Sequence, residues 1–400
     1  MRAAKSLLIV LPAIAAAPAF GAQFWQQPIG YLGVEQNSNL DLTPGGQGSS
    51  MGYVGSLADI IGIGTPETTT TIKPRIDYRE YPNDTSDNRL EGYLDFDSSY
   101  KSQRSSANIF GEIDHRDELN AELSQAVYDD VNPNAPTQPQ TGRTQTGATR
   151  DSGYVVPSYA FNVTQRVAVG ASGMYQKVDY SPNDDVRYVN FDYYQGKLFT
   201  TWTFTQNSDL TFGAYENHFN ATRYDSSAKA AGGSVDLSTS WTPLFSTRAG
   251  IVVQHSEIDN LIPPAFNGSV NTWGGSFSAI YKGEVQQLRA DLSRNITPSG
   301  GGSVYVNEQA QLEYDRRITQ RLTLTTAALY LRNRGLTPGF NENARNYLRT
   351  VVEGKWMITP TWFVQGGYQY LWQKYTENPD GAANNRIYLR IGYQGLNRQW

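Results

Sequence analysis

The sequence predicts an all-β protein, a transmembrane antiparallel up-and-down β-barrel of about eighteen strands, with sixteen as the fallback count. Strand-like runs recur from Pro28 to the C-terminus, and most of them alternate apolar and polar residues. Tight turns and longer polar loops follow one another in turn between these runs. This asymmetry is typical of outer-membrane barrels, which have short periplasmic turns and longer extracellular loops.

The segment from Trp362 to Tyr375 carries the clearest strand signal. Its even positions are aromatic or apolar, whereas Gln365, Gln369 and Gln373 occupy odd positions. Alternate side chains of a strand face opposite sides, so the segment has an apolar face and a glutamine face. At a rise of about 3.3 Å per residue and a tilt near 40°, Trp362 and Trp372 are roughly 25 Å apart in height. That height matches a lipid-facing band between two aromatic girdles.

The strand count depends on one ambiguous segment. About seventeen runs are clear, but bacterial single-chain barrels have an even number of strands. We therefore expect Met51–Ile60 to form a further strand, which brings the total to eighteen. Pro74 and Pro157 lie within predicted strands, where each removes a ladder donor and favours a local irregularity. Leu322–Arg334 is apolar on both faces, so its orientation is not assigned.

Residues 1–22 are predicted to be a signal peptide and residues 23–400 the outer-membrane barrel. Arg2 and Lys5 precede an apolar stretch, and cleavage sites lie between Ala19 and Ala22. The expected location is the outer membrane of a Gram-negative cell after cleavage. Outer-membrane lipid and the barrel-assembly machinery are then expected partners.

Composition narrows the functional classes. The chain has no cysteine, which excludes disulfides, thiolate metal sites and cysteine nucleophiles. Its 33 basic and 38 acidic residues give a net charge of −5, so a nucleic-acid partner is not expected. A mean hydropathy of −0.51 is compatible with a membrane barrel, because only every second strand residue faces lipid.

Charged residues fall on the face that is predicted to line the lumen. The basic sector comprises Lys73, Arg75, Arg79, Arg349, Lys355, Arg386 and Arg390. The acidic group comprises Glu91, Asp95, Asp97, Glu112 and Asp114. The aromatic girdle is assigned to Trp202, Trp241, Trp273, Trp356, Trp362 and Trp372. Cross-strand pairing that braces the wall is the simpler interpretation of the charges. The functional interpretation is a charged translocation path, whose basic sector would suit an anionic polymer or solute.

No catalytic, cofactor-binding or metal-binding residue is predicted, and the chain is expected not to be an enzyme. His115, His218 and His255 fall on three separate predicted strands, and they do not form a catalytic pattern. The loop Leu119–Arg150 begins with a helix-capable piece. It either stays on the surface or folds inward and narrows the pore.

The whole mature chain resembles the outer-membrane β-barrel proteins encoded with bacterial exopolysaccharide export systems, which are grouped as a β-barrel porin family. The resemblance rests on the strand count and on two stretches, GYLGVEQNSNLDL and TTTTIKPRIDYREYPNDTSDNRLEGYLDF. It implies a passive channel that exports a polysaccharide across the outer membrane together with periplasmic polysaccharide-export components.

A general or substrate-specific diffusion porin for small solutes is the alternative. Porins often place an acidic constriction loop opposite a basic cluster, and Glu122, Asp129 and Asp130 lie in the long loop. A surface adhesin or phage receptor is a third class, which is less favoured because no loop is long enough to fold alone.

Overall fold

The computed structural model describes residues 21–46, 48–83, 87–123, 148–182, 188–221, 226–260, 265–336, 344–376 and 380–399. Most of the signal peptide, Asp129 and Asp130 lie outside these ranges. The elements are β1 (Gln23–Asn37), β2 (Ser50–Gly64), β3 (Thr68–Glu80), β4 (Arg89–Lys101), β5 (Ser105–Asp117), α1 (Glu118–Leu123), β6 (Thr149–Asn162), β7 (Val167–Ser181), β8 (Phe191–Thr205), β9 (Ser208–Ala221), β10 (Ser226–Thr242), β11 (Phe245–Asn260), β12 (Phe266–Lys282), β13 (Gln286–Pro298), β14 (Val304–Arg317), β15 (Leu322–Gly335), β16 (Arg345–Met357), β17 (Trp362–Tyr375), β18 (Ala382–Gln394) and β19 (Arg398–Gln399).

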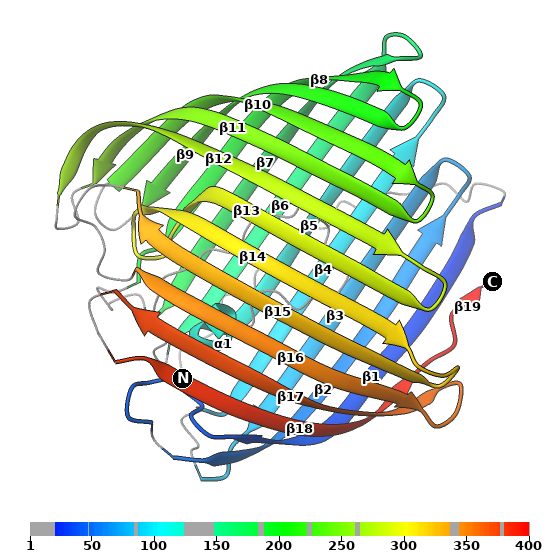
Figure 1. Ribbon diagram of the computed structural model, residues 1–400, viewed down its shortest axis with the longest axis vertical. Helices are drawn as coiled ribbons and strands as arrows, with labels where there is room; N and C mark the ends of the chain where they lie inside the picture. The colour runs from blue at the N-terminus through cyan, green and yellow to red at the C-terminus, as the bar shows by residue number, and fades with distance from the viewer. Residues whose placement is uncertain are drawn as a thin grey trace, which may run out of the picture.

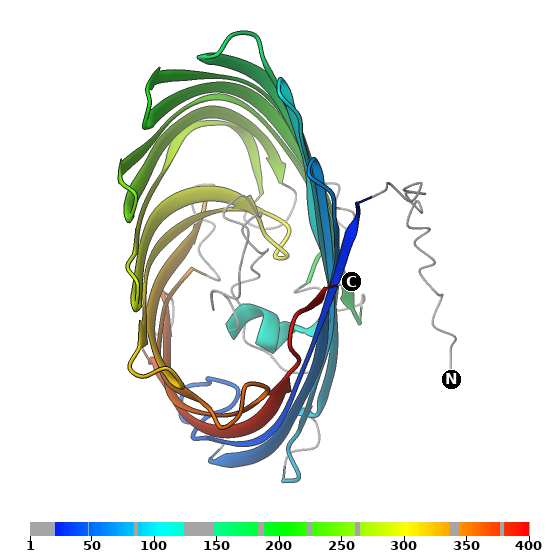
Figure 2. The same ribbon diagram turned by 90° about the vertical axis from the view of Figure 1, so that its right-hand side faces the viewer.

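The strands form one closed antiparallel barrel. Each long strand pairs with its neighbours in the sequence, and β1 pairs with β18 from Ile29–Gln394 to Asn37–Arg386. The two-residue β19 extends this closure beside the start of β1. Figure 1 shows the tilted strands, and Figure 2 shows an oval ring. The predicted fold class, with eighteen long strands in the described part of the chain, is confirmed.

The ambiguous segment Met51–Ile60 is part of β2, which pairs with both β1 and β3. The Trp25 ring lies directly over Gly62, where an added Cβ would come within 2.1 Å of the ring. A side chain there would therefore displace the tryptophan.

The predicted irregularities are present too, because ladder pairing is interrupted opposite Pro74 and again at Pro157.

In five of the tight turns a threonine hydroxyl accepts a hydrogen bond from a backbone N–H three residues later. The N···O distances are 2.9–3.0 Å at Thr65, Thr164, Thr242, Thr319 and Thr359. Side chains of this kind replace a backbone partner and define short turns. Because β1 begins and β18 ends at the short-turn end, we assign that end to the periplasm.

The outer face of the barrel is an apolar band. Leu57 and Leu32 keep 73% and 71% of their surface exposed, and many other apolar side chains of alternate positions are exposed beside them. Among the girdle residues, Trp202, Trp241, Trp356 and Trp362 lie near the short-turn end of their strands, whereas Trp273 and Trp372 lie toward the long-loop end. Within the described ranges, no helix is both long and apolar enough to cross a membrane.

Apolar packing also occurs inside the barrel, and the sequence pattern did not indicate it. The small inner cluster consists of Leu42, Leu329, Leu331, Tyr347, Leu371 and Ala382. The large inner cluster is built mainly from Val178, Tyr180, Tyr188, Val189, Phe191, Tyr193, Phe219, Ala228, Ile258 and Val304. The double-sided apolar character of Leu322–Arg334 is thereby explained, because one face of β15 contacts lipid and the other enters the small inner cluster.

Candidate translocation path

Helix α1 follows β5 directly and lies inside the barrel (Figure 2). The backbone N–H of Glu118 donates to the carbonyl of Ala148 at 2.9 Å, which joins the beginning of the inserted segment to the residue before β6. Leu119 and Ala121 are buried. The first part of the Leu119–Arg150 segment therefore folds inward, which is the second of the two possibilities that the sequence left open.

A buried ion pair attaches α1 to a distant part of the wall. Glu122 and Arg345 of β16 form a salt bridge in which their side chains are 1% and 0% exposed. In the wall, β16 is separated from β5 by β1–β4, β17 and β18. Removing one partner of such a pair leaves an uncompensated buried charge, which costs about 3–5 kcal/mol. The ion pair therefore holds α1 in a fixed place within the lumen.

The loop between β1 and β2 joins the same structure. Gln373 donates from Nε2 to the carbonyl of Leu42 at 2.7 Å, and its Oε1 lies 3.3 Å from Arg345 Nη1. Leu42 has a φ of 51°, in the left-handed region that leucine rarely adopts. Its complete burial in the small inner cluster compensates for this conformation. The loop, α1, β16 and β17 thus form one packed body.

Three members of the basic sector are bonded to carboxylates of the inner wall. Arg79 Nη1 lies 3.0 Å from Glu91, Arg75 Nε lies 3.4 Å from Asp77, and Arg386 forms a salt bridge with Glu35. Strong pairing of this kind reduces the net field that these arginines exert in the lumen.

The Glu35 carboxylate has a further partner, since the Tyr81 hydroxyl donates to it at 2.5 Å. Burial, together with the Glu35 charge, raises the pKa of Tyr81 well above its ordinary value. Tyr81 therefore stays a hydrogen-bond donor.

The acidic group divides into a bonded part and a looser part. Arg116 lies 2.7 Å from Glu112 and 2.6 Å from Asp114, and Arg150 lies 3.6 Å from Asp114. Asp97 accepts from the Asn108 side chain at 3.3 Å, and Asp95 pairs in register with Lys73. Much of the predicted acidic lining is thus a brace for the wall between β4 and β6.

Strand register arranges basic residues from both ends of the sequence in one inclined row. Lys355 of β16 is in register with Gln365 of β17, which is in register with Arg390 of β18. Across the closure, the row continues through Gly33 of β1 and Val54 of β2. It ends at Arg79 of β3 and Arg89 of β4. Lys355 lies near the short-turn end of β16, and Arg89 is the first residue of β4 after a long loop. This basic row (Lys355, Arg390, Arg79 and Arg89) therefore crosses the inner wall from one rim toward the other.

Two residues of the basic row contact neutral groups. Lys355 Nζ donates to Gln394 at 2.9 Å and lies 4.3 Å from the centre of the Phe363 ring. The Arg390 guanidinium lies 4.7 Å from the Tyr31 ring and 4.5 Å from the Tyr388 ring. Within the described ranges neither forms an ion pair. Arg349, the remaining member of the basic sector, lies beside Gln369.

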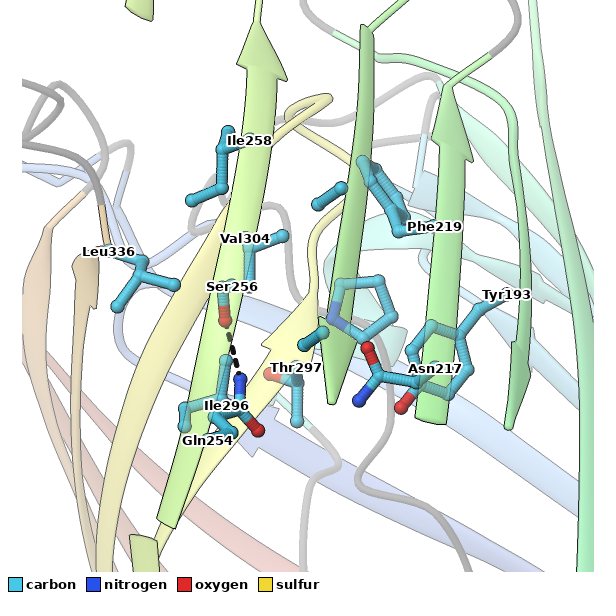
Figure 3. A pocket seen from close by; sticks show the side chains of 13 residues that line it. Tyr193, Asn217, Phe219, Gln254, Ser256, Ile258, Ile296, Thr297, Val304 and Leu336 are labelled. Atoms are coloured by element: carbon cyan, nitrogen blue, oxygen red, sulfur yellow. Dashed lines mark hydrogen bonds between the residues drawn. The ribbon is translucent and has the colours of Figure 1, made fainter. Parts of the chain in front are cut away.

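On the opposite side of the lumen, the inner wall near the long-loop end is apolar. The loop after β13 turns inward, and Val189 donates its backbone N–H to the Gly300 carbonyl at 2.8 Å. Figure 3 shows the small cavity behind this loop, between Phe219, Ile258 and Val304 of the large inner cluster. Its volume of about 20 Å³ has room for roughly one water molecule, so it is a packing defect rather than a solute site.

The three histidines are not brought together. Each contacts a polar neighbour on the outer face: His115 with Asp151 at 2.6 Å, His218 with Glu216 at 2.9 Å, and His255 with Asn271 at 2.7 Å. Over the part of the chain that the structure describes, no group of three His, Asp or Glu residues is placed to hold a metal ion.

Comparisons with known proteins add a likeness of shape. No protein-family model matches the chain, and no curated protein matches it. Among solved structures, Pseudomonas aeruginosa OccK5 (OpdH) is 10% identical, with 94% of this chain and 99% of that chain covered and a TM-score of 0.45. OpdK with vanillate, from the same organism, is 11% identical (95% and 99% covered, TM-score 0.44). OccK2 (OpdF) in complex with glucuronate is 12% identical (94% and 98%, TM-score 0.45). At such TM-scores these likenesses carry no argument about substrate.

The location follows from the barrel itself. A closed sheet satisfies every backbone hydrogen bond between strands, which allows it to cross a bilayer. An outward apolar band, girdles of tryptophan and a largely polar inner wall are the features of outer-membrane barrels. The chain is an outer-membrane β-barrel.

Proposed function

We propose that this protein is a diffusion porin for small solutes. The observation that carries the proposal is the attachment of α1 across the lumen through the buried Glu122–Arg345 pair. A segment that is fixed on both sides restricts the open cross-section on the long-loop side. Such a restriction favours small solutes over a polymer chain. It therefore supports the porin hypothesis more than the polysaccharide-export hypothesis.

The lining favours anions. Lys355 and Arg390 contribute charge without a carboxylate bonded to them in the described structure, and they lie along the inclined basic row. Rings and rows of side-chain charge determine which ions enter a pore. On the facing side, the large inner cluster is buried and contributes no charge to the lumen. We therefore propose small organic anions as the preferred solutes, and no catalytic role for the chain.

Liposome swelling with neutral sugars of increasing size tests the size restriction. The native protein should admit small sugars and exclude oligosaccharides, whereas Glu122→Ala should admit larger ones because α1 loses its attachment. Lys177→Gln is a matched control, since Lys177 is an exposed rim residue that lies 3.3 Å from Asp179 and has no part in the attachment of α1. Equal size limits in Glu122→Ala and the native protein would reject the fixed constriction.

Polysaccharide export remains the second candidate, because a basic row from rim to rim also suits an anionic polymer. A clean deletion strain separates the two. Normal polysaccharide secretion with impaired uptake of small anions supports the porin. Loss of secretion with unchanged uptake would instead favour export, together with the periplasmic components that export requires.

A further inference from the structure

A row of charged residues on the outer wall faces the membrane rather than the lumen. Strand register places Arg294 of β13 beside Glu308 of β14, and Glu308 beside Arg332 of β15. Leu292 and Tyr330, each two residues earlier on the same strand faces, are 54% and 42% exposed on the outside of the barrel. The charged row therefore shares the lipid-facing side of these strands.

Three guanidinium groups surround one carboxylate in this row. Glu308 Oε1 lies 3.1 Å from Arg334 and also bonds to Arg294, and Glu308 Oε2 lies 4.0 Å from Arg332. The side chains of Arg332 and Arg334 are 53% and 41% exposed. One carboxylate balances one of the three positive charges, so the arginine cluster (Arg294, Glu308, Arg332 and Arg334) has an excess of two.

Arg294 is the fixed member of the arginine cluster. Its guanidinium lies 4.6 Å from the centre of the Trp273 ring, and its Nε donates to the Trp273 carbonyl at 3.0 Å. Arg332 and Arg334 have no comparable attachment among the described residues. They are therefore the members that can turn toward an anion outside the barrel.

An apolar groove lies next to the arginine cluster, one row closer to the membrane centre. Phe277, Leu292, Ala310 and Tyr330 follow one another in register across β12 to β15. With Trp273 they line a groove of about 400 Å³ on the outer face. The groove exists because Ala310 has a small side chain between larger neighbours.

The wall parts at the upper end of this groove. Pairing between β12 and β13 ends at Gly275–Arg294, although both strands continue beyond it. The end of β13 turns into the barrel, where Ile296 and Pro298 line the inner cavity of Figure 3. The departure of β13 from β12 leaves Arg294 at the edge of the parted strands, while β13 stays paired with β14.

The height of the arginine cluster in the membrane indicates which kind of molecule it binds. Trp273 lies at the long-loop, extracellular end of the apolar band, where aromatic side chains mark the headgroups of the outer leaflet. Guanidinium groups bind phosphate through two parallel hydrogen bonds. We infer that this face binds a phosphorylated glycolipid of the outer leaflet, with its phosphate on Arg332 and Arg334 and an acyl chain along the groove. The site is separate from the lumen and does not depend on the proposed transport function.

Binding of a diphosphorylated lipid A, added in detergent to the purified full-length barrel, tests the inference by native mass spectrometry. Replacement of both Arg332 and Arg334 by glutamine should weaken binding about tenfold or more, because charge-assisted hydrogen bonds are lost. Ala310→Phe should also weaken binding, since it fills the groove without a change of charge. The control is the double variant Lys177→Gln/Lys229→Gln, which removes two outward charges near the same rim on β7 and β10.

The expected result is binding that requires both the phosphate and the acyl chains, with native affinity in the control. Dephosphorylated lipid A should bind the native protein no better than diphosphorylated lipid A binds the arginine double variant. Inorganic phosphate at the same concentration as lipid A should not compete with it. Equal affinity of all variants would overturn the inference. So would competition by inorganic phosphate, or cross-linking that shows the groove buried against a second copy of the chain. The conductance of the arginine double variant should equal that of the native protein.

Discussion

The two sides of the inner wall differ in the kind of side chain that faces inward. On β1, β3–β6 and β16–β18, many inward residues are charged, and they are held by ion pairs such as Arg79–Glu91 and Arg345–Glu122. On β7–β11, inward residues near the long-loop end are aromatic and aliphatic, as in the Phe191–Phe219 contact at 5.4 Å between ring centres. Both sides have the same apolar outer face. The outside of each strand is thus determined by lipid, whereas the inside depends on the segments that fold into the barrel.

The largest effect is expected where a buried charge on the charged side loses its partner. Arg345→Ala should lower the free energy of unfolding by about 3–5 kcal/mol, because Glu122 then remains buried and unpaired. Urea unfolding in lipid vesicles measures this change. The double replacement Glu122→Leu/Arg345→Leu should recover most of the loss, since it removes both charges. If the double variant were as unstable as Arg345→Ala, packing rather than charge would explain the effect.

Two tyrosines, one on the charged side of the inner wall and one on the apolar side, test the same difference with a smaller expected effect on stability. Tyr81→Phe removes the hydrogen bond to buried Glu35 and should cost about 1–3 kcal/mol. Tyr180 lies in the large inner cluster, stacked on Tyr188 at 5.3 Å, and no hydrogen bond of its hydroxyl is found in the described part of the chain. Tyr180→Phe should therefore change stability by less than about 0.5 kcal/mol. Similar losses in both variants would contradict the division into charged and apolar sides.

Ion selectivity should respond to the charged side more than to the apolar side. The double variant Lys355→Glu/Arg390→Glu should shift the reversal potential in a salt gradient toward cations, by about twofold in permeability ratio or less because the lumen is screened by salt. The matched control is Lys197→Glu on β8, whose native charge is already paired with Asp236 at 3.8 Å. A larger shift in the control would place the selective path along the other wall.

The smallest effect is expected on the outer face. Trp362 contacts Tyr393 edge-on at 5.4 Å between ring centres and is otherwise 48% exposed. Trp362→Leu should change stability by about 0.5 kcal/mol or less, as is usual for exposed positions. Heat-modified mobility on gels checks that the barrel still folds. A loss comparable to that of Arg345→Ala would mean that the outer girdle, and not the inner wall, carries the stability.

The alternation of apolar and polar residues was sufficient to predict the barrel, the strand number and the outer face. Met51–Ile60 follows from the even-number rule alone, and the Trp362–Tyr375 pattern matches the orientation of Trp362, Tyr368 and Gln369 in β17. The expectation that inward positions are polar failed at residues such as Leu329 and Leu371. Their apolar side chains have no reason to face a lumen unless something fills it.

For most strands the sequence was enough to predict which face contacts lipid, because that face depends only on a period of two and on a uniform hydrocarbon solvent; β15, which is apolar on both faces, was the exception. What the inward face contacts is visible only in the folded barrel. Glu122 and Arg345 are 223 positions apart, and Lys355 of β16 and Arg79 of β3 join one row of the inner wall only because β1 closes on β18. A local pattern contains no information about contacts that depend on closure and on the path of an inserted segment. The attachment of α1 and the basic row are therefore properties of the closed barrel, whereas the outer arginine cluster depends on the register of the neighbouring strands β13, β14 and β15.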